Sequence, residues 1–181
     1  RLDRRRGEPT RYDVATDLKG IALSIPQIGF AMGAQSTGRL ALRGALGQPP
    51  TVEALALEAP GLSAEGNLTL RAAGGLERAR FDRLAIANWF AGAADLVGRG
   101  GAAPDVVVRE GRFDLRRFSA GAGGGGGAGG GKITAALDRL QVSDSIALTG
   151  FRGEFSTRGG FSGRRWPRPA SLIVHGVAAS I

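Results

Sequence analysis

The sequence predicts a mostly β protein, built as an antiparallel meander that forms one curled sheet. Three observations lead to this prediction. Apolar and polar residues alternate along several short segments, most clearly from Leu62 to Arg71. Clusters of glycine and proline separate these segments at near-regular intervals. A loose pattern of apolar-x-apolar-x-Gly-x-apolar also recurs, beginning at Leu40, Leu62 and Ile146, which indicates a repeating β unit.

The alternation places the strands in chain order. The first two segments, 12–18 and 21–25, have their apolar residues on opposite parity, so we expect a β-bulge between them at Lys19-Gly20. Further alternating segments lie at 40–46, 55–57, 62–71, 133–137 and 146–148. The predicted turns between strands lie at 48–50, 59–61, 73–75, 103–105 and 159–160.

The segment from Leu76 to Phe90 is ambiguous. It contains a run of helix formers, Glu77 to Arg80, which would suit a short helix. The alternative is a strand over 80–87, with Phe81, Leu84 and Ile86 as its apolar contacts. The sequence therefore predicts at most one short helix, near 76–90.

The chain divides into four predicted parts. Residues 1–120 form a β-sheet segment and residues 132–163 continue that sheet. Between them, 121–131 holds nine glycines and is predicted to be a passive loop between paired strands. The tail, 164–181, is atypical because Pro167 and Pro169 cannot lie in a central strand, and a shifted reading frame would explain it. Since the chain begins at Arg1 and its one methionine is Met32, we expect it to be a piece of a longer protein.

Composition argues against an enzyme. The absence of cysteine excludes disulfides, thiolate metal sites and cysteine nucleophiles. The one histidine, His175, has no acid or nucleophile beside it in the sequence. The glycine tract and Lys132 resemble a phosphate loop, but Ile133 stands where such a loop needs Ser or Thr for magnesium. We therefore predict no catalytic residues, no metal and no cofactor.

The formal net charge of +8 comes almost wholly from arginine, because Lys19 and Lys132 are the only lysines. Such a charge would suit an anionic partner, either nucleic acid or lipid headgroups. Arginine enrichment beside abundant alanine and glycine is more simply a consequence of a high-GC genome. We predict no nucleic-acid partner.

Several short strings, taken in their order, resemble the AsmA-like superfamily, and within it the YhdP-type proteins of alphaproteobacteria. The resemblance covers roughly 12–163, and no single string is specific. The strings read DLKGxxLxIP (17–26), PGLxAxG (60–66), GLExAxFD (75–82), GRxDLR (111–116), LDxLxxxD (137–144) and LTGFxGxF (148–155).

The resemblance implies a long curled β-sheet in the periplasm, attached to the inner membrane by an anchor outside this chain. It implies a non-enzymatic role in moving phospholipid between the two membranes, with acyl chains held in an elongated apolar groove. The residues that we expect to face the acyl chains are Leu40, Leu42, Leu62, Ala64, Leu68, Leu70, Ile146 and Leu148.

Two alternatives remain open from the residues alone. The same alternation builds an ordinary closed core, so Leu62, Leu68 and Leu70 would then face a second sheet instead of lipid. A structural or adhesive β-solenoid of a surface-exposed protein, with a closed core and no ligand, would also fit.

Overall fold

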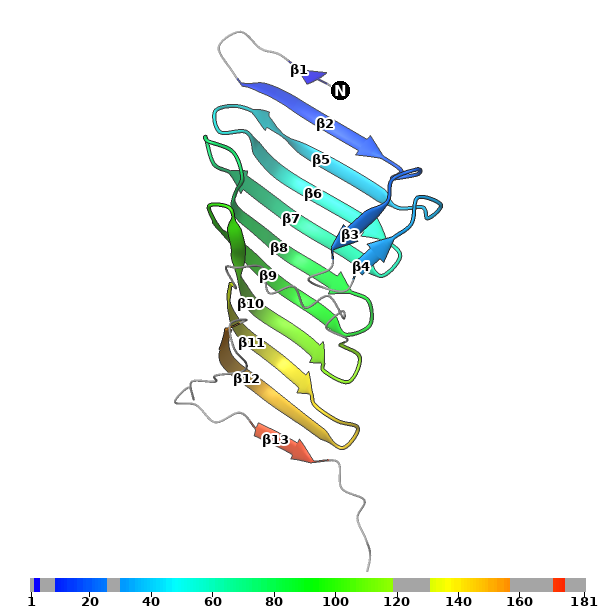
Figure 1. Cartoon of the computed structure of the whole chain (residues 1–181), viewed down its shortest axis with the longest axis vertical. Helices are drawn as coiled ribbons and strands as arrows, with labels where there is room; N and C mark the ends of the chain where they lie inside the picture. The colour runs from blue at the N-terminus through cyan, green and yellow to red at the C-terminus, as the bar shows by residue number, and fades with distance from the viewer. Residues whose placement is uncertain (1, 4–8, 26–29, 119–130, 157–170, 175–181) are drawn as a thin grey trace, which may run out of the picture.

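The computed structural model describes residues 2–3, 9–25, 30–118, 131–156 and 171–174. These residues form thirteen strands, and no helix lies among them. Eleven strands make one sheet in the order β1-β2-β5-β6-β7-β8-β9-β10-β11-β12-β13, while β3 and β4 form a separate two-stranded sheet (Figure 1). Neighbouring strands are antiparallel except for β10 and β11, which are parallel. The prediction of a mostly β, curled meander is confirmed.

The strands follow the predicted alternating segments but extend beyond most of them. In chain order they are β1 (Leu2–Asp3), β2 (Thr10–Thr16), β3 (Leu23–Ile25), β4 (Phe30–Met32), β5 (Arg39–Leu46), β6 (Thr51–Ala59), β7 (Leu62–Leu70), β8 (Leu76–Ile86), β9 (Phe90–Arg99), β10 (Ala102–Asp114), β11 (Lys132–Gln141), β12 (Ile146–Ser156) and β13 (Ser171–Val174).

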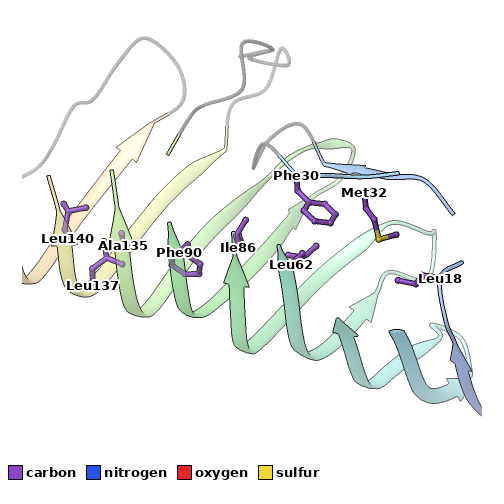
Figure 2. Close-up of a cluster of buried hydrophobic side chains, with 9 residues drawn as sticks. All are labelled: Leu18, Phe30, Met32, Leu62, Ile86, Phe90, Ala135, Leu137 and Leu140. Carbon is purple, nitrogen blue, oxygen red and sulfur yellow. The ribbon is translucent and has the colours of Figure 1, made fainter. Parts of the chain in front are cut away.

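The sheet is curled (Figure 2). We attribute the curl to β-bulges that face glycines on neighbouring strands. The register shifts between Phe81 and Leu84, where β8 pairs with Gly92 of β9. A Cβ on Gly92 would lie 2.7 Å from the Cα of Gly111 on β10 and closer still to the Glu110 carbonyl oxygen. Only a residue without a side chain lets the backbones approach this closely.

The predicted bulge at Lys19-Gly20 is wrong. Strand β2 ends at Thr16, and the chain then turns out of the main sheet instead of continuing along it. Gly20 has a φ of +83° and its N–H donates to the Ala34 carbonyl at 3.0 Å, which closes the base of the β3–β4 hairpin. The change of parity therefore marks a departure from the sheet.

The short helix considered near 76–90 does not form. Strand β8 occupies Leu76–Ile86, so it begins four residues before the strand alternative of 80–87. Ala79 and Phe81 share one parity, while Leu84 and Ile86 share the other, and the bulge between them keeps all four on one face. The resulting three-residue spacing from Phe81 to Leu84 imitates a helical pattern.

The predicted turn at 103–105 is also misplaced. The chain turns instead at Gly100 and Gly101, whose φ values of +65° and +93° suit glycine. Pro104 lies inside β10, at an irregularity of the register between Ala102 and Asp105. A proline is tolerated there because the ladder is already interrupted.

The glycine tract joins two parallel strands. Because β10 and β11 run in the same direction, the connection after Asp114 has to return to the opposite end of the strands before Lys132. Of the predicted loop 121–131, only Gly131 lies within the described residues. In the predicted tail 164–181, only Ser171–Val174 is described, and it pairs antiparallel with β12.

Candidate functional site

The apolar residues of the sheet lie on one face, because residues paired across neighbouring strands point the same way. One row runs across the strands through cross-strand pairs such as Leu62 with Ile86. Figure 2 shows four members of this row, Leu62, Ile86, Phe90 and Leu140, on the inner side of the curl. Its members from β6 to β12 are Ala59, Leu62, Ile86, Phe90, Phe113, Leu140 and Leu148.

A second row lies on the same face, towards the opposite ends of the strands. It also runs across strand after strand by direct pairing, for example Leu68 with Ala79. Its members are Val52, Leu68, Ala79, Leu96, Val106 and Ile133. Small and large residues alternate between the two rows across the strands: Ala64 pairs with Leu57 and Leu84, Gly66 with Leu55 and Phe81, and Ala135 with Val108. We call this continuous surface the apolar face.

Seven of the eight sequence-predicted residues lie on the apolar face. Leu62 and Ala64 are buried, whereas Leu40, Leu42, Leu68, Leu70 and Leu148 are partly buried. The register joins them through Leu40 with Leu57, Leu42 with Leu55 and Leu57 with Ala64. The eighth, Ile146, begins β12 beside the β11–β12 turn and is 38% exposed, so it lies at the end of the strands.

The β3–β4 hairpin covers part of the apolar face. Phe30 and Met32 of β4 are buried in one cluster with Leu18, Leu62 and Ile86. Figure 2 shows Phe30 and Met32 above the sheet, on the side where Leu62 and Ile86 project. Among the described residues, this hairpin is the only secondary structure outside the main sheet.

An aromatic group that sequence reasoning missed lies at one end of β9 and β10. Trp89 contacts Phe113 and Phe118 edge to face, with ring centroids 5.2 and 4.9 Å apart. Phe90 lies 6.4 Å from Phe113. At least 23 positions of the chain separate Trp89 and Phe90 from Phe113 and Phe118, so no local pattern predicts their contact.

The opposite face carries the charges. On it, Asp95 is buried beneath two arginines, with its Oδ2 2.5 Å from the Arg78 Nη2 and its Oδ1 3.0 Å from the Arg109 Nε. The second contact is an ion pair without hydrogen-bond alignment. Arg109 also donates to Asp82 at 3.0 Å, and this bond, followed by that from Arg80, lowers the pKa of the Asp82 carboxyl.

Tyr12 links β2 to β6 across the intervening strand β5. Its hydroxyl donates to the Thr51 carbonyl at 2.9 Å, and its ring lies across Gly44, where a Cβ would be 2.9 Å from the Tyr12 Cζ. Burial, and then the nearby Glu53 carboxylate, raise the pKa of the Tyr12 hydroxyl.

The described ranges contain no group of three or more His, Asp or Glu side chains placed to hold a metal ion. Within the same ranges, no helix has the length and apolar character needed to cross a bilayer. Comparisons of the chain with protein-family models, curated proteins and solved structures find no match. The resemblance to AsmA-like proteins therefore rests on the sequence strings alone.

Proposed function

We propose that the apolar face holds the acyl chains of phospholipid, and that the chain is a non-enzymatic segment of a periplasmic lipid-transfer protein that maintains the outer membrane. The anchor to the inner membrane would lie outside this chain. The observation that carries the proposal is the division of one open sheet into a continuous apolar face and a charged face. An ordinary two-sheet core would cover the apolar face with a second sheet, and the described residues provide only the β3–β4 hairpin.

The physics of lipid transfer suits such a face. Moving an acyl chain out of a membrane exposes apolar surface, at about 0.8 kcal/mol for each methylene. A chain of about fifteen methylenes would cost on the order of 12 kcal/mol in water. A continuous apolar face removes most of this cost and needs no specific chemistry, because all acyl chains present the same surface.

The β-solenoid alternative fits the topology less well. Solenoid coils stack strands in parallel around a closed core, whereas the described strands follow one another mostly antiparallel in a single sheet. No particular observation favours an adhesive or structural role, so we retain lipid transfer as the one proposed function.

Native mass spectrometry of the purified protein tests the proposal, with co-purified phospholipid as the expected result. Leu68→Arg should abolish that retention while far-UV circular dichroism remains that of a β protein, because an arginine at an open face can extend its guanidinium into water. The matched control on the same strand is Ser63→Arg. Ser63 is exposed on the charged face and pairs with Glu58, so an arginine there gains an opposite charge.

Two results would contradict the proposal. The first is purified protein without phospholipid. The second is an unfolded Leu68→Arg beside a normally folded Ser63→Arg, because a closed core cannot accept an unpaired charge.

A further inference from the structure

The two rims of the sheet, where the strands end, differ in composition. At one rim the described loops 47–50, 71–75 and 100–101 contain only small, proline or polar residues, and Leu46 at the end of β5 is the exposed large apolar side chain there. At the other rim the loops after β8, β10 and β11 each carry a large apolar residue. We call residues 87–89, 114–118 and 142–146 the aromatic rim.

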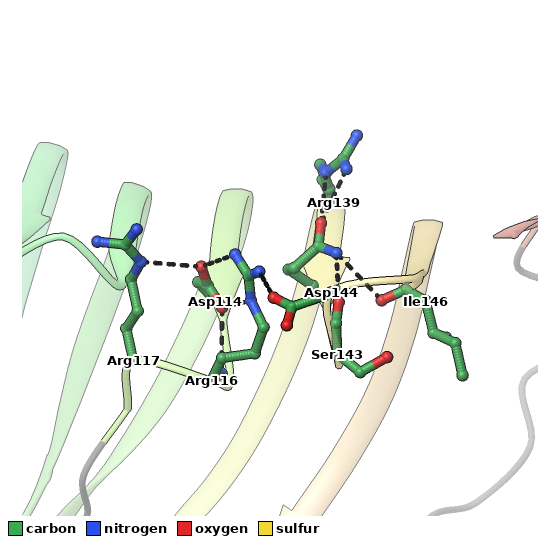
Figure 3. Close-up of polar contacts among 8 residues, drawn as sticks. Asp114, Arg116, Arg117, Arg139, Ser143, Asp144 and Ile146 are labelled. Carbon is green, nitrogen blue, oxygen red and sulfur yellow. Dashed lines mark hydrogen bonds and ion pairs between the residues drawn. The ribbon is translucent and has the colours of Figure 1, made fainter. Parts of the chain in front are cut away.

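The three segments of the aromatic rim are joined into one structure by backbone hydrogen bonds. The Asp114 N–H donates to the Trp89 carbonyl at 2.7 Å, and the Leu115 N–H donates to the Gln141 carbonyl at 2.9 Å. Side chains reinforce these links, since the Arg116 guanidinium contacts both Asp114 and Asp144 (Figure 3). Gln141 also donates to the Ser143 carbonyl at 2.6 Å.

The aromatic rim continues the apolar face over the ends of the strands. Phe113 belongs to the first row of that face, and Trp89 and Phe118 pack on its ring. Farther along the rim, Val142 and Ile146 are 40% and 38% exposed. An apolar surface therefore extends from the inner side of the sheet to exposed loops, which does not occur in the described loops of the opposite rim.

The charges of the aromatic rim cancel. It holds two arginines, Arg116 and Arg117, and two aspartates, Asp114 and Asp144, for a formal sum of zero. Both arginines pair with Asp114, with Arg116 as close as 2.6 Å and Arg117 at 3.4 Å. A neutral surface gains nothing from anionic lipid or nucleic acid, whereas tryptophan and exposed aliphatic residues favour the interface of a bilayer.

We propose that the aromatic rim binds the surface of a zwitterionic phospholipid bilayer. This inference deepens the proposed function and rests on it, because it gives the lipid a place to enter or leave the apolar face. Trp89 and Phe118 would lie at the headgroup level, with Val142 and Ile146 inserted beside them. The opposite rim would remain in water.

The test uses vesicles of pure phosphatidylcholine and the fluorescence of Trp89. The chain has two tryptophans, so Trp166→Phe makes Trp89 the only reporter. We expect its emission to shift to shorter wavelength as vesicles are added. In that background Val142→Asp should weaken binding by roughly tenfold or more, since it replaces an inserted aliphatic side chain by a charge. Ala72→Asp, an exposed site on the opposite rim, is the matched control and should bind as before.

Several results would overturn the inference: no shift with phosphatidylcholine, a shift only with anionic phosphatidylglycerol, or equal weakening by Val142→Asp and Ala72→Asp. A change of oligomeric state in Val142→Asp without any vesicle binding by the parent would instead assign the rim to a protein contact. Native mass spectrometry on the same samples separates the two proposals. Retained phospholipid without vesicle binding refutes the rim alone, and vesicle binding without retained phospholipid refutes the proposed function alone.

Discussion

Replacing Gly92 with alanine tests the physical cause of the curl. Gly92 lies in β9 between Leu84 of β8 and Gly111 of β10. The added Cβ would meet the Cα of Gly111 at 2.7 Å, the Glu110 carbonyl carbon at 3.1 Å and the Glu110 oxygen closer still. All three atoms belong to the backbone, so no side-chain rotation relieves the clash and the strands have to separate.

The magnitude follows from two opposing effects. Overpacking a tight site costs about 1–3 kcal/mol, and a clash with backbone belongs at the upper end, near 3 kcal/mol. Gly→Ala also restricts the unfolded chain, which favours folding by about 0.4–1 kcal/mol. The net loss in the free energy of unfolding should be about 2 kcal/mol. With a urea m value of about 2 kcal/mol/M, the midpoint of urea unfolding should fall by about 1 M.

The matched control is Gly33→Ala. An added Cβ there meets nothing within 4 Å, so only the effect on the unfolded chain remains. The urea midpoint should stay the same or rise slightly. If Gly92→Ala unfolds at the same urea concentration as Gly33→Ala, close backbone approach at Gly92 does not sustain the curl, and our explanation of the bulges fails.

Two further predictions concern the ion pairs. Asp95→Asn should lower the free energy of unfolding by about 2–3 kcal/mol, which is less than for a fully buried pair because the Arg78 side chain is 56% exposed. Arg83→Gln, which removes an exposed ion pair with Glu65, should lower it by under about 1 kcal/mol. Equal losses in the two variants would show that the buried Asp95 ion pairs stabilise the fold no more than an exposed pair does. Bonds from Arg116 lower the pKa of the Asp114 carboxyl, so its contribution is present above the unfolded pKa of about 3.9 and is lost as pH falls through the folded pKa. The urea midpoint of Asp114→Asn should therefore be lower than that of the parent at pH 7, and the two midpoints should converge in acid. A difference between the midpoints that does not change with pH would show that Asp114 acts by packing alone.

Alternation predicted the strands where the chain runs regularly, as in β7, which extends over Leu62–Leu70 within the predicted 62–71. It failed wherever a bulge changes the parity. In β8 the inward apolar residues are odd-numbered before the bulge (Ala79 and Phe81) and even-numbered after it (Leu84 and Ile86). A sequence window that includes both sides of the bulge therefore shows no two-residue period. A bulge depends on the facing strand as well as on its own residues, so one segment read alone cannot place it.

Contacts between residues far apart in the chain could not be predicted from the sequence for a different reason. Asp95 meets Arg109 only because β9 and β10 pair with a bulge beside Val108. Trp89 meets Phe118 only because the β8–β9 loop and the end of β10 lie at the same rim. Each contact depends on the order and register of strands, which local patterns do not contain. The candidate residues on the apolar face were predictable because they depend on parity alone.

Parity also explains how such a face can grow. Several strands change parity, among them β6 between Val52 and Leu55 and β8 between Phe81 and Leu84. The same change occurs in β10 between Val108 and Gly111 and in β11 between Leu137 and Leu140. After each change the inward positions are again apolar or glycine, so the apolar face continues although the alternation does not. Neighbouring strands lie about 4.8 Å apart, and each added strand extends both rows by one residue without any new motif. Under the proposed function, a surface built in this way would gain capacity for acyl chains in proportion to its strands, which is what a carrier of a long, featureless ligand requires.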